Sequence, residues 1–274
     1  MPGPAAEVIR SFGNERIKRA RALDDRKVRR ETGLFRAEGR DKLARARRGG
    51  FQPSELFLVE TTAGESWARE LAEWAEAGKA PVSWVSAPVM AKLSAMANAS
   101  PVVALLKQRY GSLPAVHDLQ QADTWLVLEE IRDPGNLGTI IRTADAAGAK
   151  GVVLVGHSAD PFSPEAVRAS AGSLFALPIV EAPVATITPW IACWPGLVLG
   201  SAATGADDYR NAADRHPVLL LIGSEAKGLS AELTGLCHRL ARIPMAGSTE
   251  SLNAAIATAI LLFEVRRRFL DPLT

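Results

Sequence analysis

Pro217-Val-Leu-Leu-Leu-Ile222 runs directly into Gly223-Ser-Glu-Ala-Lys-Gly-Leu-Ser230, so an unbroken apolar stretch ends in a polar, glycine-rich loop. A short apolar run bounded by turn-forming residues is typical of a strand buried on both faces. Four similar runs occur nearby, at Trp125–Glu129, Gly151–Val155, Gly196–Ser201 and Arg239–Ile243. Helical patterns separate most of them, at Leu137–Gly148, Pro164–Ala171, Ala185–Trp194, Ser230–Gly235 and Leu252–Phe269. The alternation predicts an α/β fold with a parallel sheet covered on both faces.

The front of the chain shows a shorter α/β pattern. Helices are predicted at Asn14–Arg30, Arg40–Arg48, Ser66–Glu76 and Pro88–Met96, and strands at Leu34–Ala37, Glu55–Val59, Val82–Val85 and Val102–Lys107. The stretch that follows has no strong period and contains glycine, proline and a polar run, which is typical of a linker. We therefore predict a small α/β domain at 1–110, a linker at 111–123 and the larger parallel-sheet domain at 124–274.

Composition favours a soluble protein with a full core. The chain has 274 residues, of which 47% are hydrophobic. Met1 to Phe12 lacks the pattern of a signal peptide, and the apolar stretch Leu252 to Phe263 is too short to span a bilayer. We expect a cytoplasmic protein with no membrane association. Cys193 and Cys237 form no metal-binding pair and are expected to be buried free thiols.

The charge is distributed unevenly along the chain. Residues 1–50 carry 15 Lys and Arg against 7 Asp and Glu, whereas the other 224 residues carry 17 against 23. A basic segment on an otherwise acidic chain favours a face that meets a polyanion such as nucleic acid. The alternative is a solvated helix whose charges pair along its own surface.

Three polar, glycine-containing segments follow predicted strands: Asp133–Arg142, Gly223–Ser230 and Pro244–Asn253. Ligands of open parallel sheets bind beyond the carboxyl ends of the strands, so these loops are expected to form one composite site. We expect Asn136 to cap the helix that follows it, and Ser251 is a candidate cap for the last helix. Asn253 must find partners in the backbone or in a ligand, because asparagine forms helices poorly.

Other catalytic patterns fail on inspection. Gly223-x-x-x-x-Gly228 resembles the start of a phosphate-binding P-loop, but Leu229 stands where that loop needs lysine. Asp160 stands where a nucleophile elbow would need glycine. The four histidines show no triad and no metal-ligand spacing, so we expect no metal. Nucleotide hydrolysis is therefore disfavoured.

Taken together, the three loops resemble the signature of the SpoU (TrmH-like) branch of the SPOUT methyltransferases across roughly residues 122–270. The matching residues are Asp133-Pro-x-Asn136-x-Gly138-x-x-x-Arg142, Ile222-Gly-Ser-Glu225-x-x-Gly228-Leu and Ile243-Pro-Met-x-Gly-x-x-x-Ser251-Leu-Asn253. The front half is similar to the RNA substrate-binding domain often fused to this family. That similarity rests on Asn14-x-x-Ile17-Lys, Leu23, Arg26-Lys-x-Arg29 and Phe35-x-x-Glu38-Gly39.

The resemblance implies a fold and a cofactor. The larger domain would carry a deep trefoil knot, which general topology rules would not predict. S-adenosylmethionine would be bound in the knot by Gly223, Ile243, Met245 and Leu252. Family enzymes are homodimers with the site near the interface, so the last helix, Leu252–Phe269, is expected to contribute to the contact.

The resemblance also implies methylation of a ribose 2′-hydroxyl in RNA. Arg142 would lie at the hydroxyl, and because arginine is almost never neutral we expect it to bind the substrate phosphate and orient the ribose. The proton would go to water or to a transiently neutral guanidine. Asn136, Glu225, Ser251 and Asn253 would fix Arg142 and the substrate. The expected RNA contacts are Arg16, Lys18, Arg26, Lys27, Arg29, Arg168 and Lys227.

The target RNA stays open at this point. Fusion to an amino-terminal RNA-binding domain favours large-subunit (23S) rRNA, either as a housekeeping site or as an antibiotic-resistance site. Transfer RNA is the alternative substrate. A non-catalytic RNA-binding factor for ribosome assembly on the same fold is the alternative from another class of protein.

Overall fold

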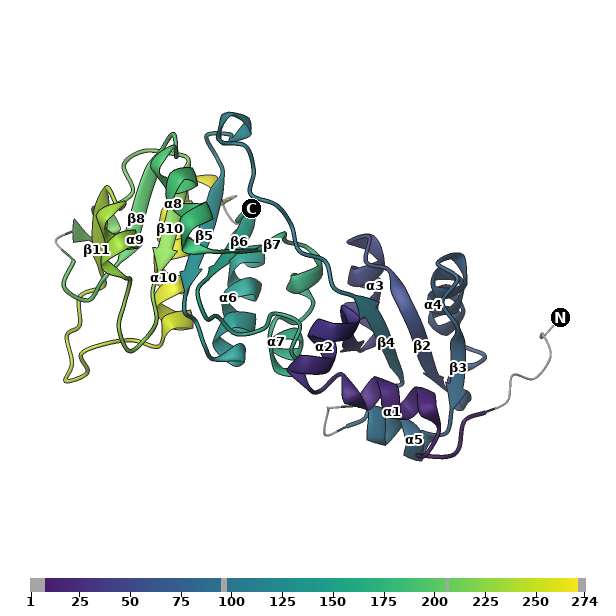
Figure 1. Cartoon of the computed structure of the whole chain (residues 1–274). Coiled ribbons are helices and arrows are strands. Elements are labelled where there is room, and N and C mark those ends of the chain that lie inside the picture. Colours follow the sequence, from purple (N-terminus) through teal and green to yellow (C-terminus); the bar gives the residue numbers. More distant parts are fainter. Residues whose placement is uncertain (1–7, 95–97, 206, 271–274) are drawn as a thin grey trace. The chain divides into compact units, whose positions relative to one another are not determined.

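The computed structural model describes residues 8–94, 98–205 and 207–270, and the chain forms two compact units. The first unit comprises the chain up to Arg109 together with Phe162–Ala176, and the second comprises Tyr110–Pro161 and the chain from Leu177 onward. Phe162–Ala176 lies inside the range predicted for the second domain but belongs to the first unit. Each unit has its own sheet and is described by itself below (Figure 1).

The first unit is built on a four-stranded sheet in the order β1-β4-β2-β3. Its strands are β1 (Leu34–Glu38), β2 (Pro53–Val59), β3 (Val82–Val85) and β4 (Val102–Lys107). Its helices are α1 (Glu15–Ala22), α2 (Arg26–Thr32), α3 (Arg40–Arg48), α4 (Ser66–Ala77), α5 (Ala87–Leu93) and α7 (Pro164–Ala169). Apart from the first helix, the predicted elements of this unit are confirmed to within a few residues. Ala95 and Met96, at the end of the helix predicted at Pro88–Met96, lie outside the described residues.

The single basic helix predicted at Asn14–Arg30 is wrong, because the chain breaks into α1 and α2. Asp25 begins α2 as its N-cap, and its carboxylate accepts the Lys27 N–H at 2.7 Å. Arg29 donates to the carbonyl oxygens of Leu23 and Asp24 at 2.8 and 2.9 Å, which holds the turn between the helices. Aspartate is one of the strongest N-cap residues, so its local signal overrides the helical period of its neighbours.

Helices pack on both faces of this sheet. On one face, Ile17 of α1 and Met90 of α5 pack against Phe57 and Leu105. The segment from the distant part of the chain adds aromatic packing at β1, the edge strand: Phe162 and Phe175 have ring centroids 4.8 and 6.3 Å from that of Phe35. Phe162–Ala176 therefore completes the hydrophobic core of the first unit.

The second unit contains a wholly parallel sheet of seven strands in the order β7-β6-β5-β10-β8-β11-β9. Its strands are β5 (Thr124–Glu129), β6 (Gly151–Val155), β7 (Ile179–Ala182), β8 (Leu197–Ser201), β9 (Asp207–Asp208), β10 (Val218–Ile222) and β11 (Arg239–Arg242). Its helices are α6 (Pro134–Ala146), α8 (Val184–Ala192), α9 (Ala231–Gly235) and α10 (Ala254–Arg266). The predicted parallel sheet is confirmed. The apolar stretch Val218–Ile222 forms β10, which lies near the centre of the sheet.

Helices pack on both faces of the seven-stranded sheet, as the continuous apolar strands predicted. Ile187 and Trp194 pack with Val127 and Leu219 in the core on one face. The α10 helix packs on α6 and β10, and Figure 1 shows these two helices together beside the sheet. Arg266, at the end of α10, is buried and donates to the carbonyl oxygens of Ala147 and Ala122. That buried guanidinium fastens the last helix to the end of α6.

The two short edge strands β7 and β9 were not predicted, because each is only a few residues long and carries no alternating pattern. The cysteine prediction is partly wrong: both thiols are free, but Cys193 is exposed and Cys237 is half-buried. Burial raises the pKa of the Cys237 thiol to about 11. Within the described ranges, none of the helices has the length and apolar character needed to cross a membrane.

Candidate active site

A cavity of about 670 Å³ lies at the carboxyl edge of the parallel sheet. Its walls are the loops after β8, β10 and β11 together with the start of α10. All four residues expected to hold the cofactor line it: Gly223, Ile243, Met245 and Leu252. Glu225 and Ser251, expected in the catalytic group, also line it. Two of the three predicted loops therefore meet in one cavity of a size suited to a small-molecule ligand.

The third loop, at the start of α6, joins through hydrogen bonds. Asn136 Nδ2 donates to Glu225 Oε1 at 2.9 Å, and Asn253 Nδ2 donates to the same oxygen at 2.8 Å. Asn253 Nδ2 also donates to Asn136 Oδ1 at 3.0 Å, and the Ala254 N–H donates to Glu225 Oε1 at 3.0 Å. Three predicted residues from three separate loops thus form one network on a single carboxylate oxygen. A carboxylate oxygen that accepts several N–H bonds is fixed in direction.

The helix caps differ from those predicted. Asp133, not Asn136, caps α6, and its Oδ1 accepts the Asn136 N–H at 2.6 Å. Asn253, not Ser251, caps α10, and its Oδ1 accepts the N–H groups of Ala255 and Ile256. Because Asp133 caps the helix, the side-chain amide of Asn136 can donate to Glu225 instead. Asn253 uses both ends of its carboxamide, one for the backbone and one for the network.

Gly223 has a steric role at the mouth of the cavity. A Cβ on Gly223 would lie 2.0 Å from the carbonyl carbon of Gly228, so only glycine fits between β10 and the returning loop. The backbone of this loop therefore forms part of the cavity wall. A glycine that allows such close backbone approach agrees with the expectation that main-chain groups contact the ligand.

A second cavity of about 230 Å³ adjoins the first. The two share Ser224, Glu225 and Ala254, and the second is also lined by Asn136 and Lys227. Lys227 is therefore placed beside the network, as an RNA contact would need to be. The Asn136–Glu225–Asn253 network lies at the boundary between the two cavities.

Within one chain, Arg142 lies outside both cavities. It is exposed on α6, six residues after Asn136, which puts it about 9 Å further along the helix and about 120° round it. Neither cavity lining includes it. The structure thus assembles Asn136, Glu225, Ser251 and Asn253 and leaves Arg142 on the outer surface of the unit.

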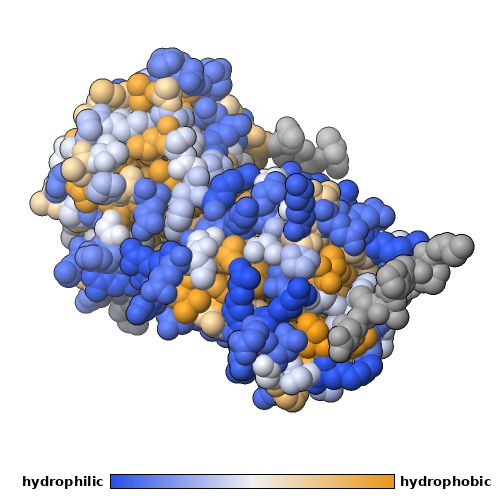
Figure 2. Space-filling view, turned by 45° about the vertical axis from the view of Figure 1, so that its right-hand side comes forward, coloured by the Kyte–Doolittle hydropathy of each residue, from blue (hydrophilic) through white to orange (hydrophobic). Residues whose placement is uncertain are grey.

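The expected RNA contacts of the first unit fall into two groups. Lys18, Arg26 and Lys27 are exposed on α1 and α2, and Arg168 is exposed on α7 of the same unit. Strongly hydrophilic side chains are prominent on the face seen in Figure 2. Lys18 and Lys27 pair with Glu15 and Glu31 of their own helices, and all four cations remain exposed to solvent, where a polyanion could reach them.

Arg16 and Arg29 both bind groups within the first unit, but only Arg29 is buried. Arg16 lies 3.5 Å from the carboxylate of Glu55 and donates to the Ser83 hydroxyl at 2.8 Å. Burial raises the pKa of Glu55, and the nearby Arg16 opposes that rise. Arg29 is only 3% exposed and bonds backbone carbonyls, so the expectation that it contacts RNA is corrected to a structural role.

Sequence reasoning missed part of the cavity wall. The loop after β8, from Ser201 to Thr204, lines the larger cavity together with Arg242 and Glu250. The rule that ligands bind at the carboxyl ends of parallel strands would have identified that loop, since the preceding strand was predicted. In the described part of the chain, no group of three or more His, Cys, Asp or Glu residues is arranged to hold a metal ion.

The fold and site thus describe a class of two-unit proteins in which a parallel sheet carries a ligand-sized cavity at its carboxyl edge and a second unit carries exposed cations. Residues 123–263 match the SpoU rRNA Methylase family, and residues 14–104 match the MRM3-like substrate binding domain. This chain belongs to the SpoU rRNA Methylase family.

Relatives at full length agree with this assignment. The chain is 35% identical to a 23S rRNA (uridine(2479)-2'-O)-methyltransferase of Streptomyces viridochromogenes, over 97% of this chain and 94% of that protein. The AdoMet-bound rRNA methyltransferase of Sinorhizobium meliloti is 40% identical with a TM-score of 0.88, covering 97% of this chain and 99% of that one. The SpoU methyltransferase AviRb of Streptomyces viridochromogenes with AdoMet is 32% identical with a TM-score of 0.82, covering 93% and 99%.

Proposed function

We propose that this protein transfers a methyl group from S-adenosylmethionine to a ribose 2′-hydroxyl of large-subunit rRNA. The observation that carries the proposal is the convergence of Gly223, Ile243, Met245 and Leu252 on one cavity that adjoins the Asn136–Glu225–Asn253 network. The similarity over nearly the whole chain to enzymes named as rRNA 2′-O-methyltransferases supports the substrate class.

The residues of the larger cavity fit the cofactor. Ile222, Met245 and Leu252 provide apolar surface for an adenine ring and a methionine side chain, while the backbone beside Gly223 provides hydrogen-bonding groups. Bound S-adenosylmethionine supplies an activated methyl group, so the protein must supply position and a path for the proton. The network on Glu225 fixes the loops at the boundary of the two cavities, where the ribose hydroxyl would meet the methyl group. Ser251, at the cavity wall, is proposed to hydrogen-bond within the site.

We further propose a homodimer through α10 that completes the site with Arg142. An apolar stripe on α10 supports this, because Ile256 and Phe263 are 50% and 43% exposed and lie seven residues apart on one helix face. Large apolar side chains in such a stripe favour burial against a second copy. In the dimer, Arg142 of one protomer would bind the phosphate of the RNA held at the site of the other and orient its ribose.

The first unit is proposed to hold the RNA through Lys18, Arg26, Lys27 and Arg168, with the half-exposed Arg16 as an auxiliary contact. The match of residues 14–104 to a substrate-binding domain supports this role. We also propose that the second unit contains a trefoil knot and that the protein is cytoplasmic.

The test is transfer of tritiated methyl groups from S-adenosylmethionine to isolated 23S rRNA, 16S rRNA and tRNA, followed by nucleoside analysis. We expect a 2′-O-methylated nucleoside from 23S rRNA alone. Methylation of tRNA would replace rRNA with the alternative substrate. Failure to bind S-adenosylmethionine in a calorimetric titration would instead favour a non-catalytic ribosome-assembly factor.

A further inference from the structure

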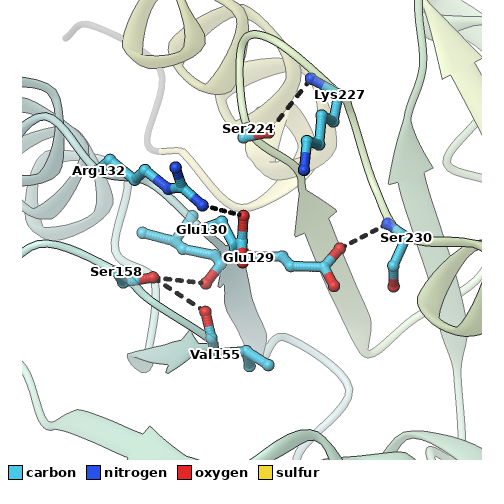
Figure 3. Close-up of polar contacts among 9 residues, drawn as sticks. Glu129, Glu130, Arg132, Val155, Ser158, Ser224, Lys227 and Ser230 are labelled. Atoms are coloured by element: carbon cyan, nitrogen blue, oxygen red, sulfur yellow. Dashed lines mark hydrogen bonds and ion pairs between the residues drawn. The ribbon is translucent and has the colours of Figure 1, made fainter.

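Polar side chains gather where β5 ends, around the smaller cavity. Figure 3 shows the Arg132 guanidinium and the Lys227 side chain on either side of the Glu130 carboxylate. Arg132, Lys227 and Glu130 all line the cavity. Arg132 Nη2 lies 2.9 Å from Glu130 Oε2, while its side chain remains 65% exposed. The guanidinium is thus held by one nitrogen and offers its other N–H groups to a ligand.

The backbone is shaped to place this ion pair. Glu130 adopts a left-handed conformation with φ of 53°, which is uncommon for a residue other than glycine. Its N–H donates to the Val155 carbonyl at 3.1 Å. Gly156 leaves room for the side chain, because a Cβ there would lie 3.2 Å from Glu130 Cγ. Such strain persists where the surrounding structure enforces it, most often at functional sites.

The other charged side chains that line the smaller cavity, Asp133 and Glu225, already accept hydrogen bonds within the protein. The Asp133 carboxylate caps α6, and Glu225 Oε1 accepts N–H groups from Asn136, Asn253 and Ala254. The cavity therefore presents fixed amide and carboxylate groups, from Asn136 and Glu225, beside two exposed cations, Arg132 and Lys227. Hydroxyl groups both donate and accept hydrogen bonds and suit the fixed amide and carboxylate groups, while phosphates suit the cations.

We infer that the smaller cavity receives the acceptor ribose of RNA and that Arg132 and Lys227 bind the phosphates on its two sides. Glu130 is a positioning residue that holds Arg132. This inference rests on the proposed function, and it assigns a site to the substrate separate from the cofactor cavity. The two cavities meet at Glu225, so a ribose in the smaller one would face a methyl group presented from the larger one.

The test compares Arg132→Ala and Lys227→Ala with a matched control in the full-length protein. Arg210→Ala is the control, because Arg210 forms the same kind of ion pair with Asp208 and is 63% exposed, but lines neither of these cavities. We expect each cavity variant to raise KM for 23S rRNA about tenfold with kcat little changed, since a phosphate contact contributes uniform binding. The slope of log KM against log salt should shrink by about 0.7 to 0.9 for each cation removed.

The Glu130→Gln variant tests the position of Arg132 separately from its charge. It keeps both cations, so the salt slope should stay near wild type, whereas KM should rise about threefold with kcat little changed, because Arg132 is no longer held in place. Calorimetry should give wild-type affinity for S-adenosylmethionine in all these variants. Wild-type KM in the Arg132 and Lys227 variants, or an equal rise in the Arg210 control, would overturn the inference.

Binding of a substrate analogue tests the ribose site independently of methyl transfer. Uridine and guanosine 3′,5′-bisphosphate each carry one ribose between two phosphates. Titration with S-adenosylhomocysteine present should show binding to the wild type and at least a tenfold loss in Arg132→Ala/Lys227→Ala. If the wild type methylates no RNA yet binds the bisphosphates in this way, the reaction fails and the site stands. If methylation occurs but neither bisphosphate binds and the double variant has normal KM, the site fails and the reaction stands.

Discussion

The side-chain amide of Asn253 donates to the Oδ1 of Asn136 over 3.0 Å, joining the first turns of two helices that lie 117 residues apart in sequence. The same Asn253 caps α10 through its Oδ1. One carboxamide therefore contributes both to the stability of a helix and to the alignment of the site. Removing the Asn253 side chain should therefore affect both stability and catalysis, and the two effects can be measured separately.

Asn253→Ala should lower the free energy of unfolding by about 0.5–2 kcal/mol, the usual cost of losing an N-cap. It should also lower kcat for methyl transfer at least tenfold, because Asn136 and Glu225 lose their shared partner. Urea unfolding and transfer kinetics measure the two effects. Ser251→Ala is the control for stability and should unfold like wild type, because Ser251 does not cap the helix. Full activity in Asn253→Ala would contradict the role of the network.

Arg142→Ala should abolish methyl transfer while leaving the affinity for S-adenosylmethionine near wild type, because Arg142 lies outside the cofactor cavity. The proposed dimer adds a sharper expectation. Mixing Arg142→Ala with Glu225→Gln, each inactive alone, should restore about a quarter of wild-type activity, since random pairing gives half mixed dimers with one intact site each. Absence of recovery in subunits shown to exchange would place Arg142 in the site of its own chain.

Gly223→Ala should destabilise the protein by about 1–3 kcal/mol or more and weaken cofactor binding, because its Cβ would meet the Gly228 backbone. Gly247→Ala, in the loop after β11, is the matched control, since a Cβ there meets nothing within 4 Å. Thermal unfolding with and without S-adenosylmethionine tests both. A Gly223→Ala protein as stable as the control would show that the loop can shift without cost.

Stability should fall in mild acid because of His238. Its Nδ1 accepts the Val198 N–H at 3.0 Å, and burial together with Arg215 lowers its pKa from 6.5. Below about pH 6.5 the unfolded chain therefore binds more protons at this residue than the folded one, so the free energy of unfolding decreases as pH falls. His238→Asn, whose Oδ1 can accept the same N–H, should flatten the dependence of Tm on pH between 5 and 7. A His238→Asn variant whose Tm falls with pH as steeply as that of wild type would contradict this assignment.

The sheet and most of the site were predictable because they depend on local sequence signals. Continuous apolar strands such as Val218–Ile222 identify a parallel sheet, and the carboxyl-end rule then brings Gly223 and Ile243 together. The caps were misassigned because Asp133, Asn136, Ser251 and Asn253 are all good capping residues, and only the backbone geometry selects one at each helix. The break at Asp25 was missed for a related reason, since a cap can interrupt a helical period.

Other features depend on long-range packing that no local pattern encodes. The burial of Arg29 follows from the turn that it closes, so its charge alone suggested a surface role. The location of Arg142 outside both cavities depends on the angle around α6 relative to the cavity wall. The association of Phe162–Ala176 with the first unit depends on contacts with Phe35 and Phe51, which are more than a hundred residues away.

That association makes the amino-terminal unit inseparable from the rest of the gene product. The polypeptide passes between the two units three times, after Arg109, after Pro161 and after Ala176. A truncation ending at residue 109 would remove Phe162 and Phe175 and uncover Phe35, so the excised fragment should aggregate rather than fold. A recombination event that exchanges this unit for another would have to replace two separate stretches of coding sequence at once, which restricts how such an enzyme can acquire a new RNA target.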